Sequence, residues 1–200
     1  MIDYDAWYSI AILMLVKYAN MNLQSTVGLG YHSGSAVIAN GNADTVLGLD
    51  GSKTSVSTNE SVLTFGIENF YANEWKYLDG LFGYGGYLYK KDVEDMTADP
   101  TSASELTGGT YEKINTAVIA SADGSAVSDI SYDTTHPHLV FPTAVGSPNP
   151  SGDTCWANTN FNCVITGGSF YNGLSDGLFS FRVIYAVGNA DTGAGVCAIE

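Results

Sequence analysis

The first strong pattern in the chain is an apolar run between residues 6 and 16. Asp3 and Asp5 precede this run and can cap a helix, which is expected to continue to about Asn20–Leu23. Apolar side chains occur on nearly all sides of this helix, so we expect burial on several sides. The run is much shorter than the roughly 20 residues of a membrane-spanning helix, and it lacks the basic start of a secretory signal. We therefore predict a core helix and no membrane insertion.

After the helix, the pattern changes to short apolar segments separated by turns. Residues 28–59 are rich in glycine and serine and predict loops with short strands, and residues 92–110 predict an exposed loop. Aromatic residues on both sides of Gly85-Gly86 predict a β-hairpin. Further strands are expected at residues 62–65, 164–166 and 178–183. The predicted class is α+β, with a buried N-terminal helix, short antiparallel strands and long loops, and residues 1–200 are expected to form a single domain.

The charge balance excludes several classes of partner. The chain has 7 Lys and Arg against 21 Asp and Glu, which gives a net charge of −14, and only 14% of its residues are charged. Nucleic-acid binding normally requires clustered cations that replace condensed counterions, and Lys90-Lys91 is the only adjacent basic pair. We therefore expect no nucleic-acid partner. At 200 residues the chain can bury roughly 70% of its unfolded surface, which is enough for a core without a metal.

The last third of the chain combines a regular frame of glycine and apolar residues with side chains of every chemical type. The frame includes residues 167–169, 177–181 and 194–195. Such a pattern is typical of a scaffold that displays a recognition surface, whereas catalysis needs a few defined groups. The candidate ligand-binding residues are Trp156, Asn158, Asn160, Tyr171, Asn172, Leu174, Ser175, Ser180, Arg182, Ile184, Tyr185, Asn189 and Asp191.

Arg182 is the most distinctive of these candidates, because it is the only arginine of the chain. Strand alternation would place Ser180, Arg182 and Ile184 on one face and the residues between them on the other. Arginine, tryptophan and tyrosine dominate the energetics of protein interfaces, which favours a binding role. For Trp156 and Tyr185, a place in the core remains the alternative.

This segment resembles the variable segment of proteins diversified by retroelements, which have a C-type-lectin-like domain related to formylglycine-generating enzymes. The family reads Gly-Gly-Ser-Trp, then Gly-Leu-Phe-x-Phe, then Gly-Ala-Arg; this chain has Gly167-Gly168-Ser169-Phe170 and Gly177-Leu178-Phe179-Ser180-Phe181, and Cys197 where the arginine is typical. Residues 3–19 look like the opening helix of the family, and residues 67–80 look like its Glu-Asn-x-x-Gly-Asn-x-Trp-x-Trp-x-Asp-Gly signature. The match is weaker over residues 28–62 and 92–136.

The resemblance implies a non-enzymatic receptor-recognition domain. In the family, a reverse transcriptase copies a template repeat with errors at adenines, and the copy replaces the C-terminal coding segment, here about residues 154–200. Members act on virion tails or are displayed on cell surfaces, so the resemblance implies a cell-surface protein or glycan as the partner. Family members include monomers and trimers, which leaves the oligomeric state open. A structural virion or surface subunit is the first alternative.

A formylglycine-generating-like oxidase is the second alternative, since those enzymes resemble this chain in the signature at residues 67–80. They use two cysteines placed shortly after the Gly-Gly-Ser motif, and residues 170–174 contain none here. Cys155 and Cys163 precede the motif. They could form a disulfide in an oxidising compartment or remain two free buried thiols. We therefore expect no enzymatic activity.

Candidate metal ligands are few. His136-Pro137-His138 could direct two imidazoles to one side of an extended segment, and a turn before the next strand is the alternative. Asn69 and Asp79 could contribute to a calcium site, as in some lectin-like domains, but no spaced array of oxygen ligands accompanies them. In the signature at residues 67–80, polar side chains are expected mainly to hydrogen-bond irregular backbone. These polar residues are Glu68, Asn69, Asn73 and Asp79. No metal or cofactor is expected.

Overall fold

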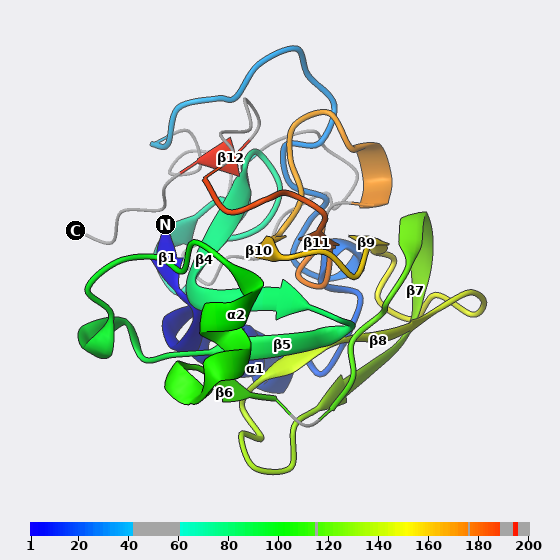
Figure 1. The fold of residues 1–200 in the computed structure, drawn as a ribbon. Helices are drawn as coiled ribbons and strands as arrows, with labels where there is room; N and C mark the ends of the chain where they lie inside the picture. The colour runs from blue at the N-terminus through cyan, green and yellow to red at the C-terminus, as the bar shows by residue number, and fades with distance from the viewer. Residues whose placement is uncertain (42–60, 115, 176, 189–193, 196–200) are drawn as a thin grey trace.

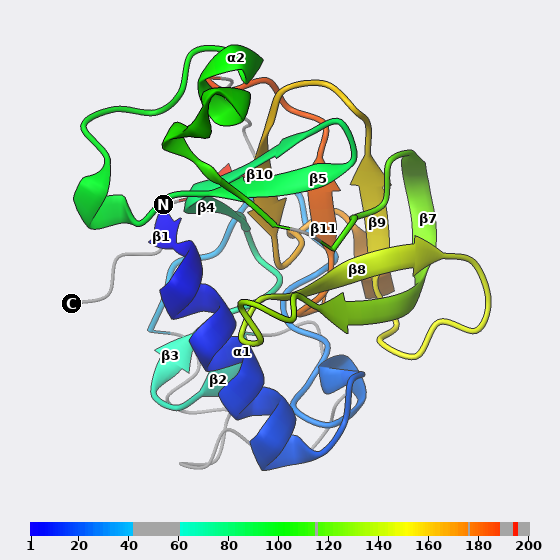
Figure 2. The same cartoon turned by 60° about the horizontal axis from the view of Figure 1, so that its bottom comes forward.

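A large mixed β-sheet forms the frame of the protein and curves around its core (Figures 1 and 2). The computed structural model describes residues 1–41, 61–114, 116–175, 177–188 and 194–195. The strands of this sheet are β1 (Ile2–Asp3), β4 (Trp75–Tyr84), β5 (Tyr87–Lys90), β6 (Glu112–Lys113), β7 (Ala122–Tyr132), β8 (Val140–Val145), β9 (Thr154–Ala157), β10 (Asn162–Thr166), β11 (Phe181–Val183) and β12 (Ala194–Gly195). Their order is β6-β5-β4-β10-β11-β9-β7-β8, and β1 and β12 both pair with β4.

The sheet confirms the α+β class but differs from the expected set of short antiparallel strands. β11 pairs with β9 in parallel, and β1 and β12 run parallel to β4. β4 and β7 are long, at 10 and 11 residues. The predicted hairpin is confirmed, because β4 and β5 are joined at Gly85-Gly86, where both glycines have positive φ. A separate two-stranded sheet pairs β2 (Leu63–Thr64), which lies within the strand expected at residues 62–65, with β3 (Ile67–Glu68), which was not predicted as a strand.

The N-terminal helix α1 (Tyr4–Tyr18) begins at the predicted cap. The Asp3 carboxylate accepts a hydrogen bond from the backbone N–H of Ala6 at 3.0 Å. The helix buries one face against the sheet, but Leu13 is 55% exposed and Val16 is 75% exposed. The expectation of burial on several sides was therefore wrong, because the sheet covers only the Trp7 side. Within the described ranges, no helix is long and apolar enough to cross a membrane.

The two faces of the sheet carry different side chains, because successive strand residues point to opposite sides. The inner face packs on α1 and forms the main core. This core includes Trp7, Met14, Leu78, Val127, Phe141, Cys155, Val164, Phe181 and Val183. The outer face carries a second cluster, in which Trp75, Cys163 and Ile165 are buried and Tyr77, Trp156, Tyr185 and Val187 pack against them.

The region predicted as an exposed loop at residues 92–110 is partly ordered and partly buried. It contains a 3₁₀ turn (Val93–Asp95), the short helix α2 (Ala103–Glu105) and a π-helical turn (Leu106–Thr110). Leu106 is buried in a small cluster with Phe82 and Tyr111. The burial of Leu106 was not predicted, because the residues around it in the sequence are mostly polar.

The turn interpretation of the His136-Pro137-His138 segment is confirmed. The backbone N–H of Leu139 donates to the carbonyl of His136 at 2.9 Å. The two imidazoles contact different carboxylates: His136 Nδ1 lies 3.2 Å from Asp133, and His138 Nε2 lies 2.6 Å from Asp5. In the described part of the chain, no group of three or more His, Cys, Asp or Glu residues could hold a metal ion.

The structural interpretation of the signature at residues 67–80 is confirmed for Asn73 and Glu68, whereas the Asn69 amide donates to the side chain of Asn40 and Asp79 lines a pocket. The Asn73 side chain accepts from the N–H of Ile38 at 2.9 Å and donates to the carbonyl of Ile38 at 3.0 Å. The Glu68 carboxylate accepts from the N–H of Gly41. These side chains attach the segment that precedes residue 42 to the start of β4. The expected loops and strands at residues 42–60 lie outside the described residues.

Candidate ligand-binding surface

The outer face of the sheet carries an arginine held between two tryptophans. Neighbouring strands set a row of side chains across β4, β10, β11 and β9, because Ile165 is paired with both Tyr77 and Arg182, and Arg182 is paired with Trp156. Trp75 lies two positions before Tyr77 on the same face of β4. Four strands therefore bring aromatic and cationic side chains from distant parts of the sequence to one place.

The guanidinium of Arg182 stacks on both indole rings. Its Cζ lies 4.4 Å from the ring centre of Trp75 and 4.2 Å from that of Trp156. The two indoles stand nearly perpendicular, with ring centres 6.0 Å apart. Arg182 Nη1 donates to the hydroxyl of Tyr185 at 3.0 Å. We call Trp75, Trp156, Arg182 and Tyr185 the arginine stack.

The arginine stack reaches solvent through only some of its members. Trp75 is fully buried and Arg182 is 7% exposed, whereas Trp156 and Tyr185 are partly exposed. The rings of Trp156 and Tyr185 pack against the outer cluster and are also partly exposed, so the core interpretation is confirmed only in part and their binding role stays a prediction. Trp75 was not among the predicted candidates, yet its ring contacts both Arg182 and Trp156.

The loop after β10 displays the most exposed of the candidate residues. Tyr171 is 47% exposed, and Leu174, in the 3₁₀ turn Gly173–Ser175, is 63% exposed. The backbone beneath them is fixed, because the N–H of Gly173 donates to the carbonyl of His32 at 2.9 Å and the N–H of Phe170 donates to the carbonyl of Asn73 at 3.0 Å. A held backbone with outward side chains suits recognition.

The remaining polar candidates help to shape the loops. Asn158 Oδ1 accepts from the N–H of Asn160 at 2.8 Å and from the side chain of Asn162 at 2.7 Å. Asn172 accepts from the hydroxyl of Ser169. Among these residues Asn160 is exposed, whereas Asn158 and Asn172 are half-buried, as are Ser175 and Ile184 elsewhere in the segment. Asn189 and Asp191, together with Cys197, lie outside the described residues.

Ser180 belongs to the interior rather than to the displayed surface. Its side chain is fully buried, accepts a hydrogen bond from the N–H of Gly177 at 3.2 Å and donates to the carbonyl of Ser175. The alternation that correctly separates Arg182 from Phe181 and Val183 does not extend to Ser180, because this residue precedes β11 and lies in a turn.

A buried carboxyl group supports this turn from the inner side. Asp153 is 1% exposed, and its Oδ2 accepts a hydrogen bond from the N–H of Phe179 at 2.8 Å. Burial raises the pKa of Asp153 to about 8, although the hydrogen bond from Phe179 acts in the opposite direction. No pattern in the sequence points to this residue, since only the fold brings it to the Gly177-Leu178-Phe179 segment.

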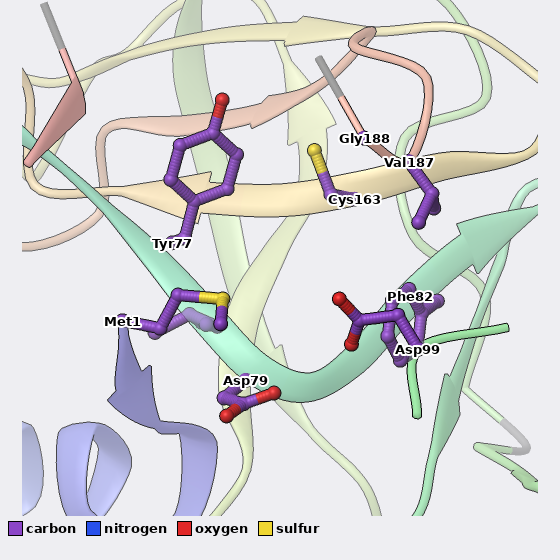
Figure 3. Close-up of a pocket in the computed structure, with 9 residues that line it drawn as sticks. Met1, Tyr77, Asp79, Phe82, Asp99, Cys163, Val187 and Gly188 are labelled. Atoms are coloured by element: carbon purple, nitrogen blue, oxygen red, sulfur yellow. The ribbon is translucent and has the colours of Figure 1, made fainter. Parts of the chain in front are cut away.

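A pocket of about 190 Å³ opens on the same outer face (Figure 3). β4 supplies Asp79 and Phe82, β10 supplies Cys163, and the segment before α2 supplies Asp99. Burial, and then the negative charge of Asp79, raises the pKa of Asp99. The pocket could not be predicted from the sequence because its walls come from separate segments.

The two described cysteines lie on opposite faces of the sheet. Cys155 belongs to the inner core and Cys163 to the outer cluster, and both are free. The disulfide alternative is thus wrong for this structure, and the alternative of two free buried thiols is confirmed. Burial raises the pKa of Cys155 to about 12 and that of Cys163 to about 11. Thiols in this state are poor nucleophiles at neutral pH.

Comparison with known proteins does not place the chain in a family, because no family model matches the sequence and no curated protein matches it. The chemistry of the site is therefore argued from its own residues. The arginine stack and the loop at residues 169–175 present aromatic, amide and cationic groups without a paired nucleophile and base. Aromatic, amide and cationic groups of this kind can bind a ligand without a covalent step.

Proposed function

We propose that this protein is a non-enzymatic ligand-binding domain with a C-type-lectin-like fold. Its C-terminal segment, about residues 154–200, is diversified by a retroelement, and its ligand is a cell-surface protein or glycan. It acts on a virion or at a cell surface. An N-terminal helix that packs on a curved mixed sheet is compatible with such a fold.

One observation carries the proposal: the frame and the displayed side chains of the C-terminal segment are separated in space. Frame residues such as Gly167, Leu178 and Phe181 are buried. Tyr171 and Leu174 lie between them in sequence and project into solvent. A segment built in this way can change its contact residues without disturbing its core, which is the physical requirement for repeated diversification.

The energetics of such a surface favour a few anchor residues. Residues whose replacement by alanine costs about 2 kcal/mol or more of binding energy are enriched in tryptophan, tyrosine and arginine and cluster at the centre of an interface, whereas replacement of the surrounding residues costs little. Here the arginine stack has the composition of an anchor, while Tyr171 and Leu174 can add contact area at low conformational cost. Ligand specificity would then change mainly through the exposed loop.

The decisive experiment is to sequence the DNA that flanks the gene. We expect a near-copy of the codons for residues 154–200 beside a reverse-transcriptase gene, with mismatches confined to adenines of the copy. The structure sharpens this test, because mismatches should include the codons of Tyr171 and Leu174 and spare those of Gly167 and Gly177. If no such copy exists, or if the mismatches affect frame and displayed codons alike, the diversification proposal fails and a structural subunit becomes the better interpretation.

A further inference from the structure

The pocket of about 190 Å³ joins an apolar wall to two acidic side chains (Figure 3). Leu78, Phe82 and Val187 belong to the apolar part of the wall. Asp79 from β4 and Asp99 from the segment before α2 supply the carboxylates. Asp79 is half-buried and Asp99 is exposed, so a solute can reach both carboxylates from the solvent. The pocket therefore offers apolar surface and negative charge in one accessible cavity.

The two carboxylates lie close enough to repel each other. Burial, and then the negative charge of Asp79, raises the pKa of Asp99. Within the described ranges, no basic side chain and no terminal amine forms an ion pair with either carboxylate. Lys53 is the one basic residue outside those ranges. Because two like charges at one site are unfavourable, a cation placed beside both would be stabilised.

The size of the pocket restricts the ligand. Pockets that take drug-sized molecules have volumes of roughly 300–1,000 Å³, so a cavity of about 190 Å³ suits a single side chain or a small amine. A metal ion is a poorer match, because calcium takes about six to eight oxygen ligands. Two carboxylates on an apolar wall supply too few.

We infer that this pocket binds an organic cation on an apolar stem, namely a lysine or arginine side chain of the partner protein. The charged group would lie beside Asp79 and Asp99, and the stem would pack on the apolar wall, since both side chains carry an apolar stem. Tyr77 and Phe82 also line the pocket, and aromatic rings attract cations. The inference rests on the proposed function, because it names the chemistry of the cell-surface ligand and favours a protein over a glycan.

The charge of the whole chain supports a cationic ligand. With a net charge of −14, the protein attracts cations at long range and thereby raises the rate of encounter with a basic partner. This long-range attraction acts on every cation alike. The pocket would add selectivity, because only a cation with an apolar stem of suitable size gains both the charge pair and the packing.

Amide proton–nitrogen NMR spectra of the isotope-labelled protein can test the inference and locate the site. n-Butylammonium chloride is titrated at constant ionic strength, with sodium as the replaced cation. We expect saturable shifts of the amide signals of Asp79, Phe82 and Cys163. n-Butanol, which lacks the charge, and methylammonium, which lacks the stem, should each bind about tenfold more weakly. Nα-acetyl-lysine methylamide and Nα-acetyl-arginine methylamide are titrated next, and the tighter of the two identifies the side chain.

Matched variants attribute the binding to the two carboxylates. Asp79→Asn and Asp99→Asn should each weaken n-butylammonium binding about threefold to fivefold, as for partly exposed ion pairs, and the double variant about tenfold or more. Asp95→Asn is the control, because it removes an exposed carboxylate of the same segment that does not line the pocket. It should bind n-butylammonium like the wild type. The same spectra verify that each variant is folded, and the single variants serve if the double variant does not fold.

The inference is overturned if the pocket amides show no saturable shift, if n-butanol binds as tightly as n-butylammonium, or if binding is undiminished in the Asp79 and Asp99 variants. Calcium chloride that reproduces the n-butylammonium shifts would also overturn it, because it would identify a metal site. The outcome is distinguishable from that of the proposed diversification. Cation binding without a template repeat would leave the pocket standing and remove the retroelement, whereas a template repeat without cation binding would leave the diversified domain standing and remove this ligand class.

Discussion

Asp153 makes the stability of the protein depend on pH in an unusual direction. Its carboxyl group is buried behind the Gly177-Leu178-Phe179 segment, where one oxygen accepts from the N–H of Phe179 and Oδ1 has no partner. Burial raises the pKa of Asp153 from its ordinary value of 3.8 to about 8. At neutral pH the folded protein therefore keeps a proton on this group, whereas the unfolded chain releases it. An Asp153→Asn substitution is the matching perturbation, because an amide imitates the neutral acid.

The sign and size of the effect follow from proton linkage. Between the ordinary pKa and about 8, the folded state binds one proton more than the unfolded state, so the free energy of unfolding falls as pH rises. The slope for one proton is about 1.4 kcal/mol per pH unit. From pH 5 to pH 7, Asp153 should therefore remove about 3 kcal/mol of stability from the wild type. The loss ends near pH 8, where the folded carboxyl also ionises.

Urea unfolding followed by circular dichroism at pH 5, 6, 7 and 8 measures this difference. We expect Asp153→Asn to gain on the wild type steadily across the series and to be the more stable protein at pH 8. Asp123→Asn is the control, because it removes an exposed carboxylate on the same sheet and should follow the wild-type slope. Parallel pH profiles for the wild type and Asp153→Asn would refute the reasoning, since they would mean that Asp153 ionises in the folded state as easily as in the unfolded chain.

Two further predictions concern the frame and the thiols. A methyl group at Gly177 would lie 2.1 Å from Asp153 Oδ1, so Gly177→Ala should lower the free energy of unfolding by about 1–3 kcal/mol. The control is Gly108→Ala, whose methyl group would meet nothing within 4 Å and should cause no such loss. Equal losses of the two variants in urea unfolding would contradict this packing. In a Cys197→Ser background, Cys155 and Cys163 should react with iodoacetamide at pH 8 only after unfolding, because burial raises the pKa of both thiols. Mass spectrometry measures the labelling, and fast labelling of the folded protein would show that a thiol is accessible.

The sequence predicted those elements of the fold that depend on neighbouring residues in the chain, namely the N-terminal helix and the hairpin. The N-terminal helix has its cap at Asp3 and an apolar run behind it, and the hairpin has Gly85-Gly86 between aromatic strands. The long strand β7 gave no comparable signal. Its residues are mostly small or polar, and it is fixed by pairing with β8 and β9, which the pattern of Ala122–Tyr132 alone does not contain.

The candidate site was predictable to the extent that strand alternation controls it. Alternation correctly placed Arg182 on the other face of the strand from Phe181 and Val183, but it could not predict which side chains contact the guanidinium. Trp75 is provided by β4, far earlier in the chain, and it reaches Arg182 only because β10 lies between β4 and β11. Ser180 was misplaced for a related reason, because a turn ends the alternation before that residue.

The geometry also separates two kinds of variable position within the proposed surface. Tyr171 and Leu174 are exposed on a loop whose backbone is fixed by hydrogen bonds to His32 and Asn73, so almost any side chain fits there. Arg182 lies nearly buried between two indoles, and a replacement must fill that space and remove or pair a charge. Changes at the loop should therefore alter affinity by small steps, while changes at Arg182 should alter stability and ligand class together. A diversified binder of this design would explore the loop freely and the arginine stack only rarely.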